Sequence, residues 1–189
     1  MTDKKKCTAV ILAAGSGSRM KSNVAKQFML LDGKPLIWYA LDTVEQSRII
    51  DDCILVTGEA DLAYMQKEIV EKYHFSKVNT IVAGGAERYL SVGNALQMIT
   101  DLTGYVFIHD GARPFLTEKI LEDAYEAVDL KRALNRMTKE DKAVIELKYF
   151  EDLKLTEIAE VLGENVNTVK SRLYRGLRKL KVELSDTCQ

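Results

Sequence analysis

Short apolar runs alternate with amphipathic stretches along the first two-thirds of this 189-residue chain. AVILAA, CILVT and YVFIHD are such runs, and stretches such as PLIWYALDTV between them carry apolar residues at helical spacing. Buried runs flanked by helical periodicity are typical of parallel strands that helices cover on both faces. The pattern predicts an α/β sandwich with a mainly parallel sheet up to Val128.

The pattern changes after Val128, where helical periodicity continues without strand-like runs. Four segments are predicted as helices there: LKRALNRM, KEDKAVIELKYF, LTEIAEVL and NTVKSRLYRGLRKLKVEL. Because no glycine- or serine-rich linker marks the join, we expect the helix that begins at Glu118 to run directly into the next one. The sequence therefore predicts two domains, residues 1–128 and 129–189.

Composition is that of an ordinary soluble globular protein, with 47% apolar residues, 29% charged residues and a net charge of −1. Whole-chain charge therefore excludes no class of partner. Three widely spaced cysteines, Cys7, Cys53 and Cys188, favour a reducing compartment over a disulfide framework. The first apolar run ends at Ala14 and is too short to span a membrane, so we expect a cytoplasmic protein.

A glycine-rich, basic loop follows the first apolar run. Gly15 and Gly17 allow a tight turn whose backbone N–H groups approach phosphate oxygens closely. Arg19 and Lys26 add charge that would bind a triphosphate and stabilise charge on its α-phosphorus. The spacing is neither that of a P-loop nor that of the usual dinucleotide fingerprint. An ordinary strand-to-helix turn is the alternative for a bare pair of glycines.

Two further loops follow predicted strands, at residues 84–91 and 110–113. Functional loops of parallel α/β sheets lie beyond the carboxyl ends of the strands, so we expect these loops and the glycine-rich loop to meet in one crevice.

The string LAAG-x-G-x-RM followed by KQF resembles the nucleotidyltransferase signature of the 2-C-methyl-D-erythritol 4-phosphate cytidylyltransferase family of isoprenoid biosynthesis. The resemblance continues through DGKPLI, AGGAERYLSV and IHDGARPF, over about residues 7 to 128. Pentitol-phosphate cytidylyltransferases share these loops and are an alternative. The resemblance implies a truncated Rossmann-like nucleotidyltransferase sandwich that binds CTP and Mg²⁺. It also implies transfer of a cytidylyl group to a sugar-alcohol phosphate with release of pyrophosphate.

The resemblance also assigns roles to individual residues. Arg19 and Lys26 would be catalytic by gripping the triphosphate, and Asp110 would hold Mg²⁺, an ion that keeps phosphate oxygens and waters as its other ligands. The remaining nucleotide contacts would come from Ala13, Ala14, Gly15, Ser16, Gly17, Gly85, Ser91 and Arg113. For Arg113, a structural ion pair to a loop carboxylate is an equal alternative.

Three departures from the family pattern qualify this expectation. Ala25 stands where a proline is usual, and Ala86 where an acidic residue is common. Nothing after Val128 resembles the family's second half, which supplies further strands, the dimerisation arm and the residues that hold the sugar phosphate. We therefore expect a nucleotide pocket with little or no turnover and apolar surface left uncovered on the shortened sheet. The sequence does not decide the oligomeric state, because the dimerisation arm is absent.

The last two predicted helices have helix-turn-helix proportions, with Gly163 in the turn. Thr156 is placed to cap the first of them, and Asn165 or Asn167 the second. The second carries an apolar stripe, Val169, Leu173, Leu177, Leu180 and Leu184. It also has six basic and no acidic residues between positions 166 and 182, for which a solvated helix face is the alternative interpretation.

The segment from Asp129 to Leu184 resembles region 4 of bacterial sigma factors, particularly the extracytoplasmic-function type, through VIELKYFEDLKLTEIAEVLG and TVKSRLYRGLRKL. In that family the second helix of the pair enters the major groove of the promoter −35 element. By resemblance, DNA contacts would come from Thr168, Lys170, Ser171, Arg172 and Arg175. The RNA polymerase β flap is a further partner that the resemblance implies, and the family's promoter-melting domain has no counterpart before Asp129.

Three accounts of the whole chain stay open. In the first, the chain is an altered cytidylyltransferase that still makes a CDP-sugar alcohol. In the second, it is a nucleotide-binding domain joined to a DNA-binding module. In the third, it is an accidental or engineered fusion in which only DNA binding persists. We expect a CTP·Mg²⁺ pocket with reduced or no turnover together with a sequence-specific DNA-binding module.

Overall fold

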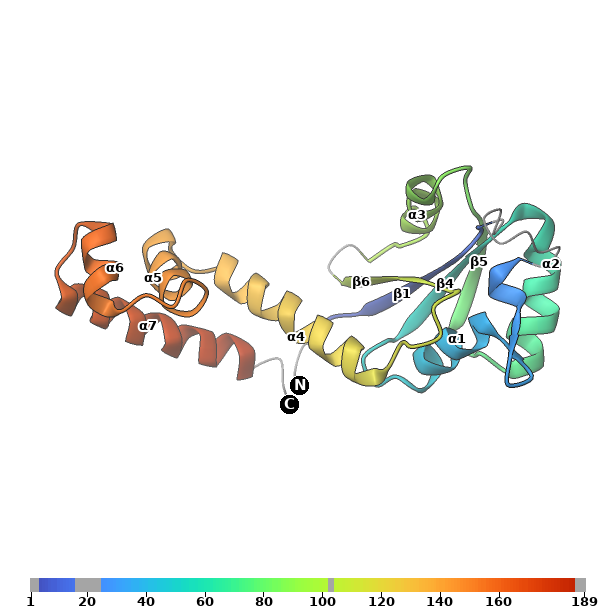
Figure 1. Cartoon of the computed structure of the whole chain (residues 1–189), viewed down its shortest axis with the longest axis horizontal. Coiled ribbons are helices and arrows are strands. Elements are labelled where there is room, and N and C mark those ends of the chain that lie inside the picture. The colour runs from blue at the N-terminus through green and yellow to red at the C-terminus, as the bar shows by residue number, and fades with distance from the viewer. Residues whose placement is uncertain (1–3, 16–24, 102–103, 186–189) are drawn as a thin grey trace. The chain divides into compact units, whose positions relative to one another are not determined.

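The computed structural model describes residues 4–15, 25–101 and 104–185 of the chain. The chain divides into two compact units, Lys5–Asp123 and a helical one that begins at Ala124 (Figure 1). The division falls inside helix α4 (Glu118–Asn135), five residues before the predicted boundary. Helix α4 thus runs without interruption past Val128, as the missing linker led us to expect.

A four-stranded parallel sheet forms the centre of the first unit. Its strands β1 (Cys7–Ala13), β4 (Asp52–Thr57), β5 (Val78–Ala83) and β6 (Tyr105–Asp110) lie in the order β5-β4-β1-β6. All three pairings in this sheet are parallel. The central strands β1 and β4 are buried almost throughout, which explains why their sequences are continuous apolar runs. The predicted α/β fold with a parallel sheet is confirmed.

Helices α1 (Leu36–Gln46) and α3 (Arg88–Leu96) lie on opposite faces of this sheet (Figure 1). On the α3 side, Ala95 packs into a core with Val10, Ile54 and Val56. Helix α1 buries residues at positions 37, 40, 41 and 44, the spacing of one helical face. The amphipathic stretches of the sequence therefore became the outer layers of the sandwich.

Shorter elements complete the first unit. Helix α2 (Leu62–Tyr64) continues into the π-helical turns of η4 (Met65–Glu71), after the 3₁₀ turn η3 (Glu59–Asp61). The 3₁₀ turn η2 (Lys26–Phe28) precedes a two-stranded antiparallel ribbon of β2 (Leu30–Leu31) and β3 (Lys34–Pro35).

Strand β6 forms one edge of the sheet, and part of its apolar surface meets solvent. Val106 is 38% exposed and Ile108 is 42% exposed. The parallel register places Ile108 beside Val10, on the face that α3 covers over the other strands. The expectation that a shortened sheet would leave apolar surface uncovered is therefore confirmed at β6.

Helices α5 (Lys139–Tyr149), α6 (Leu155–Leu162) and α7 (Val166–Ser185) pack with the later part of α4 around a second core. Val169, Leu173 and Leu180 of the predicted stripe are buried in this core, and Leu177 and Leu184 pack against it. Gly176 lets α7 approach α5 closely, because a Cβ there would lie 2.8 Å from Cδ1 of Ile145. The stripe is thus core, as predicted.

The ends of α6 and α7 differ in part from the prediction. Asn165 precedes α7, and its Oδ1 accepts a hydrogen bond from the Asn167 N–H at 2.8 Å, which confirms Asn165 as a cap. The prediction for Thr156 is wrong, because α6 begins at Leu155. The carboxylate of Glu157 accepts from the Lys154 N–H at 2.6 Å instead, so the end is held by an acidic side chain. Gly163, with φ of +64°, ends α6 in the left-handed conformation.

Among the described residues, none of the helices has the length and apolar content needed to cross a membrane.

Candidate functional site

A cavity of about 690 Å³ opens at the carboxyl edge of the parallel sheet. Its walls come from the end of β1, the loop after β5 and the loop after β6, the three segments expected to converge. Strands β4 and β5 extend the sheet on one side of β1, and β6 is added on the other side. Open α/β sheets bind ligands at the point where the strand order reverses in this way. Eight predicted site residues line the cavity: Ala13, Ala14, Gly15, Lys26, Gly85, Ser91, Asp110 and Arg113. Ser16, Gly17 and Arg19 lie outside the described residues.

The wall formed by β1 is held by a buried hydrogen bond. The Gln27 side chain donates from Nε2 to the Ala13 carbonyl oxygen at 2.7 Å, which ties η2 to the end of the strand. Neighbouring Ala25 has φ of −61°, the value that a proline ring would impose. Ala25 therefore has the backbone φ that a proline at this position would have.

The wall formed by the loop after β5 is built around Ser91. Its hydroxyl oxygen accepts a hydrogen bond from the Gly85 N–H at 3.0 Å, and the hydroxyl donates to the Glu87 carbonyl oxygen at 3.3 Å. Gly84 lies so close to β1 that a Cβ would be 2.3 Å from Cβ of Ala14. Ser91 therefore fixes the shape of the loop, and its contact with a ligand stays a prediction.

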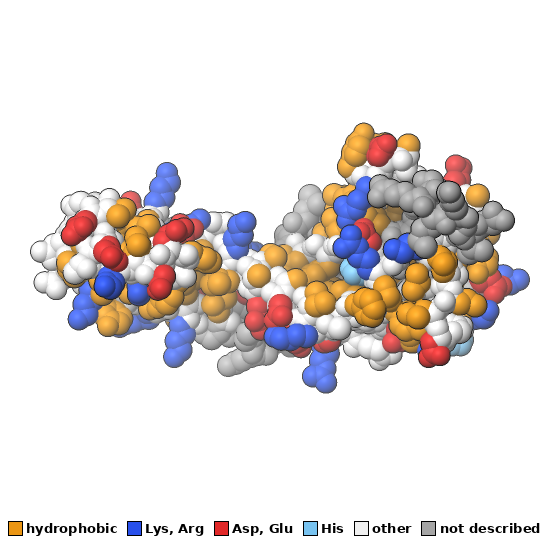
Figure 2. All heavy atoms as spheres, in the orientation of Figure 1, with side chains coloured by type: hydrophobic (Ala, Val, Ile, Leu, Met, Phe, Trp, Pro, Cys, Tyr) orange, Lys and Arg blue, Asp and Glu red, His pale blue; other side chains and the backbone are white. Residues whose placement is uncertain are grey.

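The wall formed by the loop after β6 carries Asp110 between two arginines. The Arg88 side chain donates from Nε and from Nη2 to Oδ1 of Asp110, both at 3.2 Å. The Arg113 Nη2 lies 3.0 Å from Oδ2 of the same carboxylate. The ion pair that was the alternative role for Arg113 is thus present. Figure 2 shows basic side chains gathered around an acidic one on this unit.

Basic side chains outnumber acidic ones in the lining of the cavity. Lys26, Arg88 and Arg113 face it, against the carboxylates of Glu87 and Asp110. The described residues hold no cluster of three or more His, Cys, Asp or Glu side chains that would bind a metal alone. Asp110 nevertheless suits Mg²⁺, which commonly takes one or two carboxylates and completes its shell with phosphate oxygens and water.

Sequence reasoning missed Arg88 as a site residue. It lies three residues before Ser91 in the AGGAERYLSV motif, so its position in a loop of the cavity could be predicted from the sequence. Its pairing with Asp110, 22 residues away along the chain, could not be predicted.

The predicted DNA contacts lie on α7 and divide into two groups. Thr168, Lys170 and Ser171 are exposed. Arg172 is half-buried and its Nη1 lies 2.5 Å from the Glu164 carboxylate, whereas Arg175 pairs with the buried carboxylate of Asp141. Both arginines thus hold contacts within the helical unit, which leaves their predicted roles at DNA as predictions.

Three exposed residues that the sequence analysis did not select share a helix face with Lys170 and Ser171. They are Asn167, Tyr174 and Arg178, and the spacing of three, four and seven residues places all of them on one side of α7. Tyr174 is 61% exposed near the middle of this face. An aromatic residue at the helical spacing from Lys170 was the signal that could have identified it.

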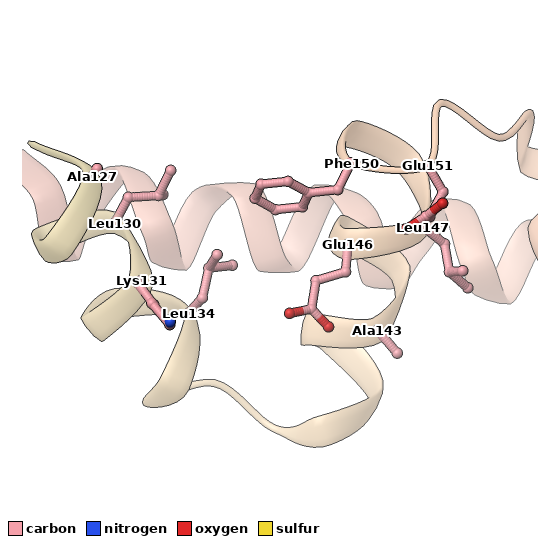
Figure 3. A pocket seen from close by; sticks show the side chains of 9 residues that line it. All are labelled: Ala127, Leu130, Lys131, Leu134, Ala143, Glu146, Leu147, Phe150 and Glu151. Carbon is pink, nitrogen blue, oxygen red and sulfur yellow. The ribbon is translucent and has the colours of Figure 1, made fainter. Parts of the chain in front are cut away.

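The helical unit also contains an apolar groove of about 720 Å³ between the later part of α4 and α5 (Figure 3). Leu130, Leu134 and Phe150 point toward the space between the two helices, and Lys131 and Glu146 flank it. Phe150, which lines this groove, is 65% exposed.

A parallel sheet with a cavity at its switch point defines the first unit as an open α/β domain. The chain belongs to the IspD family, 2-C-methyl-D-erythritol 4-phosphate cytidylyltransferase, which it matches over residues 7–142. Residues 127–180 match a second family, Sigma-70 region 4. The two matches overlap from 127 to 142, in α4 and the start of α5.

Known proteins resemble the chain over part of their length. The 2-C-methyl-D-erythritol 4-phosphate cytidylyltransferase of Lachnoclostridium phytofermentans is 46% identical over 129 residues, covering 68% of this chain and 54% of that protein. The protein of the same name from Clostridium acetobutylicum is 49% identical over 115 residues, covering 61% and 50%. The crystal structure of 4-diphosphocytidyl-2C-methyl-D-erythritol synthase from Anaerococcus prevotii has a TM-score of 0.54 at 34% identity, covering 67% and 52%. The chain spans about half the length of the curated relatives it matches.

Proposed function

We propose that the α/β unit binds CTP together with Mg²⁺ and that the helical unit binds promoter-type DNA. The observation that carries the first part is the convergence of three loops, distant in sequence, on one cavity that holds Lys26, Asp110 and Arg113. Family membership supports CTP as the nucleotide, since the relatives carry the name cytidylyltransferase. The match to Sigma-70 region 4 supports the second part.

Within this proposal each wall of the cavity holds a different part of the nucleotide. Backbone groups from Ala13 to Gly15, with Lys26 and Arg19, would bind the triphosphate, and Gly85 with Ser91 would hold the base and ribose. Asp110 would hold Mg²⁺, whose charge would neutralise phosphate oxygens and favour attack at the α-phosphorus. The chain's own contribution is to orient the triphosphate and to lower its charge, the main terms in phosphoryl-group chemistry.

Calorimetry tests the nucleotide part directly. Titration of the protein with CTP in the presence of Mg²⁺ should give one saturable binding event per chain. Circular dichroism of the same sample should establish that it is folded. A folded sample that gives no heat of binding would contradict the proposal for the cavity.

We expect pyrophosphate release from CTP and methylerythritol phosphate to stay near background. The reason is that the match covers only about half of the length of these relatives, so the rest of those proteins has no counterpart in it. A coupled pyrophosphate assay checks this, with the Lachnoclostridium relative as positive control. Turnover comparable to that control would show that the chain is an active transferase.

The exposed face of α7 supports the DNA part of the proposal. Lys170, Ser171 and Tyr174 offer a cation, a hydroxyl and an aromatic ring, and all three side chains are exposed. A basic helix of this kind fits the major groove, where cations contact phosphates and polar groups reach base edges. Arg172 and Arg175 would position α7 through Glu164 and Asp141.

Lys170→Ala should weaken binding to a −35-like duplex by about threefold to tenfold. The slope of log affinity against log salt concentration should also become smaller by about one. The physical reason is the loss of one exposed phosphate contact. Fluorescence anisotropy at several salt concentrations measures both quantities, with Lys131→Ala as a matched control on α4. An unchanged salt dependence would remove Lys170 from the interface, and equal affinity for random duplex would argue against sequence reading.

The groove in Figure 3 supports a protein partner for the helical unit, and the RNA polymerase β flap is the candidate that the region 4 match implies. Its apolar lining and the exposed Phe150 suit an amphipathic helix. Phe150→Ala should then weaken co-purification with a flap fragment and leave DNA binding intact.

A further inference from the structure

Asp110 has both of its carboxylate oxygens engaged by cations of the protein itself. Oδ1 accepts two hydrogen bonds from Arg88, and Oδ2 is paired with Arg113. A divalent cation that approaches this carboxylate is repelled by two guanidinium groups, neither of which can lose its proton at ordinary pH. The carboxylate proposed to hold Mg²⁺ is therefore already neutralised in the nucleotide-free protein.

The two arginines are attached to the protein in different ways. Arg113 belongs to the same loop as Asp110, since its N–H donates to the Asp110 carbonyl oxygen at 3.0 Å and its own carbonyl oxygen contacts the His109 ring. Arg88 begins helix α3 and comes from the opposite wall of the cavity, next to Gly85 and Ser91. Arg88 therefore links the loop after β5 to the loop after β6.

The Arg88 contact is of a kind that exchanges readily. Its side chain is 63% exposed, and both of its nitrogen donors point to a single oxygen instead of forming the two-oxygen fork. Exposed ion pairs contribute little, whereas a triphosphate offers several anionic oxygens that a planar guanidinium binds well. A nucleotide entering this cavity would outcompete Asp110 for Arg88.

We propose that Arg88 exchanges partners, from the Asp110 carboxylate in the nucleotide-free protein to the phosphates of a bound nucleoside triphosphate. This inference rests on the proposed CTP site and adds a residue and an order of events to it. While Arg88 holds Asp110, the site has low affinity for a divalent cation. When phosphates draw Arg88 away, the carboxylate becomes able to ligate the cation that accompanies them. Arg88 is thus a positioning residue for the metal and a ligand of the triphosphate.

The exchange predicts effects of opposite sign for one substitution. Arg88→Gln should bind Mn²⁺, used here as a paramagnetic substitute for Mg²⁺, roughly threefold to tenfold more tightly than the wild type when nucleotide is absent. The same variant should bind CTP less tightly, by about tenfold, when EDTA removes divalent cations. Electron paramagnetic resonance of unbound Mn²⁺ measures the first affinity, and calorimetry the second.

Three further variants make the result decisive. Arg48→Gln removes an exposed arginine outside the cavity lining and should change neither affinity. Asp110→Asn should abolish the gain in Mn²⁺ binding when combined with Arg88→Gln. Arg88→Lys keeps the charge and should restore CTP binding in part. Fluorescence of Trp38, the only tryptophan, reports whether each variant has a folded α/β unit.

A purely structural role for Arg88 would lower both affinities of Arg88→Gln, or neither, and either result overturns the exchange. That outcome leaves the proposed function intact, provided that the wild type binds CTP with Mg²⁺. Absence of CTP binding to the folded wild type would overturn the proposed function and the exchange together.

Discussion

Asp141→Ala should lower the free energy of unfolding of the helical unit by about 2 kcal/mol. The Asp141 side chain is fully buried and pairs with Arg175 and with Lys179, the latter at 3.2 Å. These contacts tie the beginning of α5 to the middle of α7 across the core. Alanine leaves a void and removes both ion pairs, although the two partly exposed cations can turn toward water, which limits the loss.

Urea unfolding followed by two probes measures this loss. Circular dichroism reports both units, whereas the fluorescence of Trp38 reports the α/β unit. We expect the substitution to shift the helical transition and to leave the Trp38 transition in place. Glu160→Ala removes an exposed carboxylate from α6 and is the matched control, for which we expect a change within about 0.5 kcal/mol. A variant as stable as this control would show that the buried ion pairs do not hold the unit together.

The same residue makes stability depend on pH. Hydrogen bonding from Arg175 lowers the pKa of Asp141 to about 2, from 3.8. Because the folded pKa lies below the unfolded one, the ion pairs stabilise the unit fully above about pH 5. Their contribution declines as the pH falls through 4 toward 2. The difference in stability between the wild type and Asp141→Ala should therefore shrink over this acidic range.

Lys26→Ala should reduce the affinity for CTP·Mg²⁺ by about tenfold or more. If the wild-type site is weak, calorimetry should detect no binding to this variant. Lys26 lines the cavity at the start of η2, and its exposed ammonium group supplies a point charge for phosphate oxygens. Its loss removes a charge-assisted contact without disturbing the core, since the neighbouring Gln27 still anchors η2 to β1.

Lys67→Ala is the matched control for this substitution. Lys67 is an exposed lysine of η4 in the same unit and does not line the cavity. We expect it to bind CTP as the wild type does. Equal affinities for the Lys26 and Lys67 variants would place the triphosphate somewhere other than the predicted loop.

Much of this architecture was predictable because it depends on local pattern. The apolar run AVILAA supplies most of the central strand β1. Both faces of this strand are covered, so apolar side chains are favoured at successive positions. The convergence of Gly15, Gly85 and Asp110 followed from the rule that loops at the carboxyl ends of parallel strands share one edge. The buried stripe of α7 followed from its helical period.

The parts that escaped prediction depend on contacts between residues far apart in sequence. Arg172 and Arg175 were predicted to contact DNA because they lie on a basic helix. In the fold, each of them is paired with an acidic side chain. Periodicity shows which face a side chain occupies and does not show what lies opposite. The same limit hid the pairing of Arg88 with Asp110. Thr156 was wrongly predicted as a cap because α6 begins one residue earlier, at Leu155, so that Thr156 lies inside its first turn.

The overlap between the two family matches spans the end of α4, the turn at residues 136–138 and the start of α5. Residues 127–142 satisfy both families and include the end of α4 and the start of α5. The physical consequence is that the α/β unit ends on a helix that also supplies Leu130, Ala133 and Leu134 to the second core.

The central claim is that the cavity at the carboxyl edge of the sheet is a CTP site, and amide chemical shifts measured during a CTP·Mg²⁺ titration test it most directly. The account predicts progressive shifts at Gly15, Gly85 and Ser91, which line the cavity, with little change at the amides of α6 and α7. Saturating CTP that leaves the amides of Gly15, Gly85 and Ser91 unshifted in a folded protein would contradict it.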